Sequence, residues 1–344
     1  MGASGTALET SDSATSDSAT SDSATSDPRA PEFRTPASAR RQRQAGQGSW
    51  WNGLPGLVYL VALVLLPLFI ILVYSFLSRA KLGVGVKWQF TLTPYTELLY
   101  SESLSGGRSF DPTYLQIIAN SFWYALITSV VCLVLAIPIA MWLATRPPER
   151  RTALVFAVTI PFWTSLLIRT YSFIIILNDN GPINGALRGI GLIDEPISML
   201  YTPFATVVGL VYTFLPFMIL PIYASAERFD FRLAEAAYDL GAGKWTVLRR
   251  VVLPSVRPGV IAGLVLVFIP ALGSYLAPEL LGGGKSSMIA NVIAAQFGAS
   301  RNWPFGAALS VLLLVITLLV LIIFAIVAKR ASRAAGRGGW EALL

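Results

Sequence analysis

The chain has 344 residues, of which 54% are hydrophobic and 13% charged, whereas a soluble domain carries about 25% charged residues. This balance indicates a membrane protein. The absence of His and the single cysteine, Cys132, exclude a disulfide and a thiolate cluster and remove the commonest metal ligand and general base, so we expect no metal, no cofactor and no catalytic residue.

Residues 1–48 differ in composition from the rest of the chain. The pentapeptide SDSAT is repeated in tandem over 11–25, and a polar stretch without apolar periodicity follows. Such a segment buries too little apolar surface to offset its ordering entropy, so we predict a disordered tail. The first apolar run starts near Leu54 and is too long for the apolar part of a secretory signal.

Apolar runs long enough to span a bilayer recur from Leu54 onward. A span needs ~20 residues at a rise of about 1.5 Å per residue. The first run, 54–77, is followed by a loop at 78–116, and the remaining runs form one transmembrane domain over 117–328. We therefore predict an all-α, polytopic membrane protein with six transmembrane helices, at 54–77, 117–144, 153–178, 203–225, 258–280 and 306–328.

The Lys and Arg residues are divided unequally between the two sides of this arrangement. Eighteen of the 26 fall in the N-terminal tail, the 145–152 and 226–257 loops and the segment 329–344, and seven fall in the other loops. Because cytoplasmic segments carry the excess of Lys and Arg, we expect both termini to be cytoplasmic and the 78–116 loop to be extracytoplasmic. Topology then explains the basic surplus, and no nucleic-acid partner is expected.

The basic loop 226–257 reads AERFDFRLAEAAYDLGAGKWTVLRRVVLPSVR and predicts two short helices. Asp230 is placed to cap a helix over 231–240, and Gly241 to end it in a left-handed conformation. A second helix is expected to start near Lys244 and to stop before Pro254. The first helix has a thin surface that lets another protein approach closely, made by Ala234, Ala236 and Ala237.

The stretch LLGGGKSS at 280–287 is similar to the end of the phosphate-binding loop G-x-x-x-x-G-K-[ST]. However, Glu279 occupies the position of the first Gly. The stretch also falls on the expected extracytoplasmic side, where ATP is absent. We therefore expect a flexible turn that leads into a re-entrant or amphipathic segment at 286–300, and no ATP hydrolysis by this loop.

A spaced motif in the 226–257 loop matches a known signature. Glu235-Ala236-Ala237, Gly241 and Val251-x-Leu253-Pro254 follow E-A-A-x-x-x-G-x(9)-I-x-L-P, with Val251 in place of Ile. This EAA motif is the signature of the permease subunits of ABC importers. Further stretches resemble the spermidine/putrescine-type permeases over roughly 55–328, among them FTLTPYTELL (90–99), IPFWTSLLIRTYSF (160–173) and RNWPFGAALS (301–310).

The resemblance implies a type I ABC importer permease fold and a multi-pass subunit of the cell inner membrane. The subunit itself is then no enzyme, because separate ABC ATPase subunits hydrolyse ATP. A second permease, a paralogue or a second copy, and an extracytoplasmic solute-binding protein complete the transporter within the membrane lipid. The expected solute is a polyamine, spermidine or putrescine. The residues expected to couple the permease to the ATPase are Glu235, Ala236, Ala237, Gly241, Val251, Leu253 and Pro254.

Charged and aromatic residues of the predicted third and fifth spans are candidates for the substrate pathway. Arg169 is an ionisable side chain within a span, which makes it a functional candidate. Alternatively, it extends to the outer headgroups or pairs with Asp179 or Glu279. Because an arginine repels a polyamine, these two carboxylates are the better candidates for receiving a cation. Aromatic faces for cation–π contacts, or simply for packing, are offered by Trp163, Tyr171 and Tyr275.

Other functions remain open alternatives. A secondary transporter, driven by an ion gradient, would usually show inverted repeats with broken helices, and the halves of the chain show no similarity. A membrane enzyme would need paired carboxylates or a nucleophile motif within the spans. Permeases of the family also serve other small organic cations and some anions, so an ABC permease for a different solute is a further alternative.

Overall fold

The computed structural model describes residues 49–80, 85–102 and 108–337. The predicted disordered tail, 1–48, lies outside the described residues, as does the end of the predicted tail 329–344. The chain divides into two compact units, Met1–Leu63 and Val64–Leu344. The first unit contributes the beginning of helix α2 (Ser49–Tyr74), and the second unit contains all the other described elements.

Within the described residues, five helical runs are long and apolar enough to cross a membrane. Three of the predicted spans lie within such a helix, namely 117–144, 203–225 and 306–328. This confirms the predicted all-α membrane fold. The five runs are α2, α4 (Thr113–Ala144), α8 (Pro203–Ala226), a run over Lys244–Leu272, and α14 (Trp303–Arg337).

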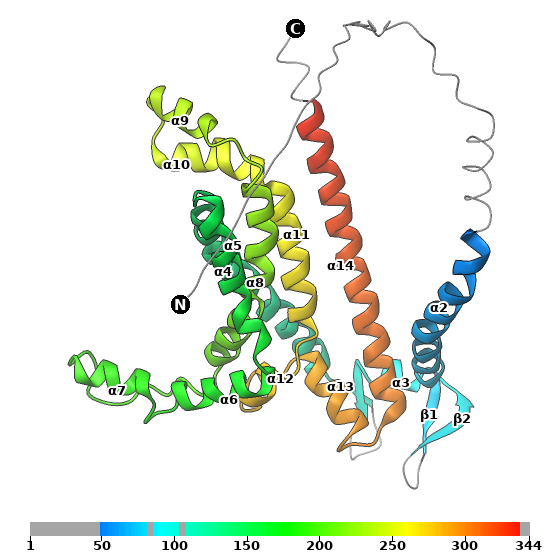
Figure 1. Ribbon diagram of the computed structural model, residues 1–344. Coiled ribbons are helices and arrows are strands. Elements are labelled where there is room, and N and C mark those ends of the chain that lie inside the picture. The colour runs from blue at the N-terminus through cyan, green and yellow to red at the C-terminus, as the bar shows by residue number, and fades with distance from the viewer. Residues whose placement is uncertain (1–48, 81–84, 103–107, 338–344) are drawn as a thin grey trace, which may run out of the picture. The chain divides into compact units, whose positions relative to one another are not determined.

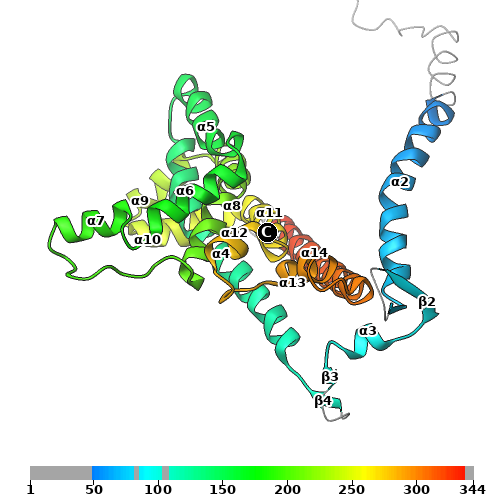
Figure 2. The ribbon, with the colours of Figure 1, turned by 90° about the horizontal axis from the view of Figure 1, so that it is seen from below.

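The predicted third span, 153–178, is not a continuous helix. It consists of α5 (Pro148–Trp163) and α6 (Leu166–Leu177), and the helical stretches on either side of the break bend by 85°. Thr164 and Ser165 interrupt the helix with extended ψ angles of 147° and 131°. Pro161, just before this point, has no backbone N–H and so cannot donate a hydrogen bond within the helix. The bent pair, counted as one, supplies the sixth span, and α6 turns away from α5 in Figures 1 and 2.

The predicted fifth span, 258–280, starts and ends earlier than expected. A single helical run comprises α10 (Lys244–Val247), the π-helical turn η1 (Leu248–Val252) and α11 (Leu253–Leu272). The prediction of a stop before Pro254 is therefore wrong. The N–H of Leu253 bonds to the carbonyl of Leu248, five residues back, and this wider turn gives the Pro254 ring room beside the preceding carbonyls. After α11 the chain breaks and forms the short α12 (Leu276–Leu281).

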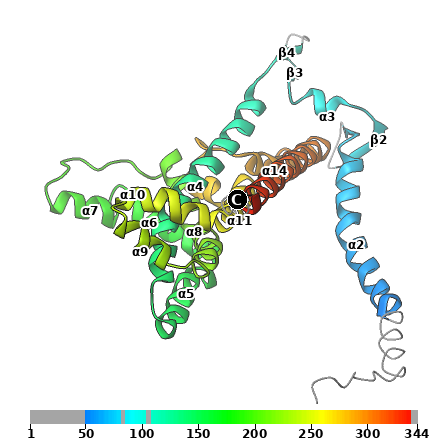
Figure 3. The ribbon, with the colours of Figure 1, turned by 90° about the horizontal axis from the view of Figure 1, so that it is seen from above.

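Helices α4, α8 and α11 pack side by side and bury the main core of the second unit, as Figures 1 and 3 show. Helices α8 and α11 approach each other closely at two glycines. A Cβ added at Gly259 would lie 2.3 Å from the Pro221 carbonyl oxygen, and one at Gly263 would lie 2.7 Å from the Met218 sulfur. Small residues thus allow this helix pair to come together, as is common between membrane helices.

The predicted loop 78–116 is largely structured. It forms one hairpin from β1 (Leu77–Arg79) and β2 (Val86–Phe90), and a second from β3 (Tyr100–Glu102) and β4 (Arg108–Phe110). The short helix α3 (Thr93–Thr96) lies between them. Two residues further, Leu98 packs against Phe305 and Leu309, near the start of α14. This packing attaches the loop to the helical bundle.

Two ends of the second unit can be distinguished in Figure 1. Helices α9 (Arg232–Asp239) and α10 lie at one end with the end of α14, and α3, α12 and α13 (Ile289–Phe297) lie at the other. An ion pair of 3.0 Å between Arg151 and Glu227 joins the start of α5 to the chain after α8. The basic loops 145–152 and 226–257 therefore share one end.

Candidate functional site

The segment 226–257, called the coupling region below, contains the predicted short helix and its predicted stop. The Asp230 carboxylate accepts a hydrogen bond of 3.0 Å from the Arg232 N–H, at the start of α9. Gly241 follows the helix with φ of +81°, a left-handed conformation. The N–H groups of Gly241 and Ala242 donate to the carbonyls of Tyr238 and Ala237, which closes the helix end in a Schellman motif.

One face of α9 packs against its own chain. Ala234 is buried with Phe229, Val247 and Val252, so it is not available to a partner as the sequence had led us to expect. Ala237 is half-buried against the same cluster, whereas Ala236 is exposed. The cluster fixes α9 against α10 and the π-helical turn.

The other face of α9 and the adjoining turn are exposed, and we call them the coupling surface. Leu240 is 89% exposed and Trp245 is 73% exposed, and Leu233 and Tyr238 are exposed beside them. Glu235 is also exposed, in the first turn of the helix, where a carboxylate interacts favourably with the helix dipole. Apolar side chains gathered on an exposed, charged segment are typical of a protein interaction site.

The coupling region is connected directly to the transmembrane core. The motif residues Val251, Leu253 and Pro254 are half-buried and lie where the π-helical turn meets α11. Because Lys244–Leu272 is one helical run, the coupling surface is joined to α11 by a helix rather than by a flexible loop. Arg151 adds a second connection, since besides Glu227 it binds the carbonyls of Ala144 and Arg146 at the end of α4.

At the opposite end, Arg169 holds the break between α5 and α6. Its side chain is only 8% exposed. Its Nη2 donates to the carbonyls of Pro161 and Thr164, at 3.0 Å for the latter, and its guanidinium lies 5.5 Å from the ring centre of Tyr212 on α8. The recorded partners of Arg169 include neither Asp179 nor Glu279, so the alternative of an ion pair with these carboxylates is wrong for the described residues. Arg169 instead donates hydrogen bonds to carbonyl groups that have no helical N–H partner because the helix breaks there.

Glu279 is held by a buried amide that the sequence analysis missed. Asn291, on α13, donates to the Glu279 carboxylate at 2.7 Å and to the Tyr275 carbonyl at 3.2 Å. The Glu279 side chain is nevertheless exposed, so its carboxylate is fixed in position and still faces solvent. Tyr275 is 41% exposed on the same short segment. The structure thus brings two of the six pathway candidates together.

The remaining pathway candidates lie on or beside α5 and α6, and α6 packs against α12. Trp163 and Tyr171 are exposed on either side of the break between α5 and α6. Asp179 is exposed just after α6. Close by, Asn184 is fully buried on α7 (Pro182–Gly189) and bonds to both the carbonyl and the N–H of Ile197, which fixes the loop between α7 and α8.

The GGGKSS stretch forms a fixed turn rather than a flexible one. Gly283 and Gly284 have φ angles of +55° and +78°. Ser286 is fully buried and bonds to Thr206 of α8 at 2.7 Å, and a Cβ at Gly282 would lie 2.2 Å from the Ser286 hydroxyl. The glycines therefore serve a tight turn packed on α8. The predicted segment 286–300 contains α13.

The buried polar residues Asn184, Ser286 and Asn291 carry no signal of their own in the sequence. Each acts through a partner 12 or more residues away, namely Ile197, Thr206 and Glu279. A single sequence does not pair such positions. The only available signal is a polar residue inside an otherwise apolar stretch, which requires a partner once it is buried.

Comparisons with known proteins place these features in a family context. Residues 113–333 match the family described as the binding-protein-dependent transport system inner membrane component. The chain is 43% identical over 258 residues to the spermidine/putrescine transport system permease protein PotB of Escherichia coli K12, covering 75% of this chain and 90% of that protein. It is 40% identical over 262 residues to PotB of Haemophilus influenzae, covering 76% and 87%.

The fold is also similar to that of solved structures. A bacterial ABC transporter involved in the import of the acidic polysaccharide alginate superposes with a TM-score of 0.64, at 17% identity, over 84% of this chain and 99% of that one. The same kind of transporter in complex with an alginate-bound periplasmic protein superposes with a TM-score of 0.62, at 16% identity, over 84% and 96%. At such identities the likeness shows the fold alone.

Proposed function

The chain belongs to the family of binding-protein-dependent transport system inner membrane components, and we propose that it forms part of the membrane pathway for a polyamine, spermidine or putrescine. The observation that carries the choice of solute is the identity of 43% over 90% of a permease named for these two compounds. The chain is a permease subunit of an ABC importer, a multi-pass inner membrane protein, and not an enzyme. Family membership also sets aside the alternative of a secondary transporter.

The partners of such a subunit are an ATPase, a second permease and an extracytoplasmic binding protein. We propose that the ATPase binds the coupling surface on α9 and α10. Exposed Leu240 and Trp245 supply apolar area there, and the surrounding charges include Glu235, Arg249 and Arg250. Burying such side chains contributes ~1.5–3 kcal/mol each, which favours a stable complex.

The energy of ATP binding reaches the spans through the helix that begins in the coupling region. When the ATPase subunits close, they displace α9, and the cluster around Ala234 carries α10 with it. Since α10 continues through the π-helical turn into α11, this displacement moves α11 against α4 and α8. The Arg151–Glu227 ion pair draws the ends of α4 and α5 along.

The pathway begins at the opposite end, near α12. Glu279 offers a fixed and exposed carboxylate, and Asp179 offers a second one after α6. A polycation is attracted to both. The exposed rings of Trp163, Tyr171 and Tyr275 provide faces for the ammonium groups. Arg169 takes no part in binding the cation, because its charge is buried and directed at carbonyl oxygens.

Both termini are cytoplasmic in this proposal. The support is the excess of Lys and Arg in the loops that share the end of α9 and α10, together with the ion pair that joins two of these loops. The carboxylates near α12 then face the binding protein, and the coupling surface faces the ATPase.

The choice of solute is tested on the cognate binding protein, from which the permease receives its substrate. Calorimetric titration is done with spermidine, with putrescine and with molybdate, which represents the anionic solutes that some permeases of the family serve. It should give heat only with the two polyamines. Binding of molybdate with no binding of either polyamine would contradict the proposed solute and leave the importer assignment untouched.

A further inference from the structure

A polar cavity of about 860 Å³ lies between the end of β1, helix α3 and the loop before α14. Ser78 and Arg79 line it from β1, Thr93 and Glu97 line it from α3 and the residue that caps it, and Arg301 and Asn302 line it from the loop. All of these segments belong to the second unit. The proposed coupling and substrate roles use none of these residues.

The side chains of this cavity favour an anion. Two arginines face one carboxylate, and Glu97 already accepts a hydrogen bond of 3.4 Å from Asn302. Arg79 uses one N–H to bind the Ser300 carbonyl at 2.9 Å. Arg301 has no hydrogen-bond or ion-pair partner among the described residues, and its φ of +49° is a left-handed conformation that costs energy in a non-glycine residue. A strained backbone thus presents an unpaired cation.

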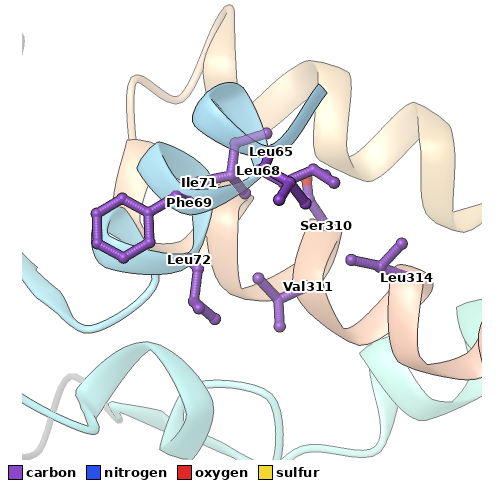
Figure 4. A pocket seen from close by; sticks show the side chains of 8 residues that line it. All are labelled: Leu65, Leu68, Phe69, Ile71, Leu72, Ser310, Val311 and Leu314. Atoms are coloured by element: carbon purple, nitrogen blue, oxygen red, sulfur yellow. The ribbon is translucent and has the colours of Figure 1, made fainter. Parts of the chain in front are cut away.

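A second cavity, of about 350 Å³, lies between α2 and α14. Figure 4 shows its lining, which is almost entirely apolar, with Leu68 and Leu72 of α2 facing Val311 and Leu314 of α14. Pro304 lines the polar cavity and Ser310 lines the apolar one, and six residues along a helix correspond to about 9 Å. The two cavities therefore follow one another along α14, with the polar cavity near the start of the helix and the apolar cavity further along it.

We propose that these two cavities bind one anionic phospholipid. Its phosphate lies between Arg79 and Arg301, and one acyl chain lies in the groove between α2 and α14. Arginine pairs with phosphate through parallel N–H donors, and basic pockets beside membrane helices bind anionic headgroups. A zwitterionic headgroup such as that of phosphatidylcholine brings the same phosphate together with its own ammonium group, which the two arginines repel, so a lipid with a net negative charge is favoured. A helix of a partner permease would also fit the apolar groove, but it would not explain the two arginines of the adjoining polar cavity.

The proposal is tested on the assembled transporter by native mass spectrometry with phosphatidylglycerol and phosphatidylcholine. The wild type should retain phosphatidylglycerol preferentially. The double variant Arg79→Gln/Arg301→Gln should bind it about thirtyfold more weakly, because it loses two cationic contacts. The matched control Lys285→Gln removes an exposed cation outside the cavity and should retain the preference.

The proposed position of the acyl chain is tested with a separate variant. Val311→Trp fills the apolar groove and should abolish phosphatidylglycerol retention, while the transporter keeps its second permease. If Val311→Trp instead releases the second permease, the groove is a permease interface and the lipid proposal is wrong. Binding of glycerophosphoglycerol, which has no acyl chains, as tight as that of the lipid would also contradict it.

Crosslinking keeps the proposal testable if the double variant fails to assemble. A photoactivatable phosphatidylglycerol, with the reactive group in its acyl chain, should label wild-type α2 and α14 around Leu68 and Val311. Labelling spread evenly over the outer helices, with no preference for these positions, would overturn the site.

Discussion

At the residue scale, single conformations and single hydrogen bonds position the candidate functional groups. Gly241 ends α9 with φ of +81°, and its surroundings leave open space. Its importance is therefore conformational and not steric. Asn291 orients Glu279, and Arg169 satisfies the carbonyls at the break in the third span. The roles of Gly241 and Glu279 can be tested with matched variants.

Gly241→Val should uncouple the ATPase from the permease. A β-branched residue in the left-handed region costs about 1–2 kcal/mol, which shifts the end of α9 and the coupling surface. We expect normal membrane insertion with loss of ATPase association or of uptake, measured by copurification and by transport in vesicles.

Gly243→Val is the matched control for this variant. Gly243 has φ of −69° and ψ of 157°, with nothing within 4 Å of an added Cβ, so a valine there is accommodated. Full uptake by Gly241→Val, or equal loss in both variants, would remove the left-handed turn from the mechanism.

Glu279→Gln should weaken uptake of a polyamine several-fold, chiefly at low substrate concentration. The change keeps the size and the hydrogen bond to Asn291 but removes the charge. An exposed charge at close range contributes ~1 kcal/mol to binding a cation, and several times more in a partly dry cavity. The measurement is initial uptake against substrate concentration.

Glu195→Gln, which changes an exposed carboxylate in the loop before α8, is the control for Glu279→Gln and should have no effect. Since Arg169 and Glu279 make no recorded contact, adding Arg169→Gln should not rescue the variant. Rescue would show that the two residues pair during transport. Unchanged uptake by Glu279→Gln alone would exclude a cation-receiving role.

At the element scale, two departures from regular helix shape this permease. The break at Thr164–Ser165 turns α6 away from α5, and the π-helical turn at Leu248–Val252 sits between the coupling surface and α11. A π-helical turn acts as one extra residue in an α-helix, and such turns are frequent at functional sites. Here it sets the rotation of α10 relative to α11.

Deleting Arg249 should therefore prevent movements of the coupling surface from being passed to α11 in a productive orientation. Removing one residue converts the turn toward regular α-helix and rotates α9 and α10 about 100° around the axis of α11. We expect inserted protein without ATP-driven uptake. Arg249→Ala keeps the length of the turn and should transport, so equal activity of the two variants would exclude the role proposed for the turn.

At the scale of the whole molecule, the all-α class, the spans 117–144, 203–225 and 306–328 and the left-handed stop at Gly241 followed from the sequence. Long apolar runs and a glycine after a short amphipathic helix are local signals. The break after Trp163 was missed because Thr164 and Ser165 sit in an apolar run, and their extended conformation depends on Arg169 binding the freed carbonyls. The continuation of the helix through Pro254 depends on a π-helical turn, and the fixed position of Glu279 depends on Asn291. These features arise from packing and distant contacts.

Cysteine labelling tests the orientation of this arrangement. In a background with Cys132→Ser, Lys285→Cys should react only with reagents applied from outside, and Asp239→Cys only with reagents applied from inside. The native Cys132 is fully buried in the core, where serine has a similar size and can donate to the Val211 carbonyl as the thiol does. Labelling of both positions from the same face would contradict the topology.

The most direct test of the central claim is uptake by the reconstituted transporter. The chain is assembled with its ATPase, second permease and binding protein in proteoliposomes, and radiolabelled spermidine and putrescine are followed with and without ATP. We predict accumulation that requires both ATP and the binding protein, and that is lost in Gly241→Val but kept in Gly243→Val. Accumulation driven by an ion gradient without ATP, or no accumulation of either polyamine by an assembly that hydrolyses ATP, would contradict it.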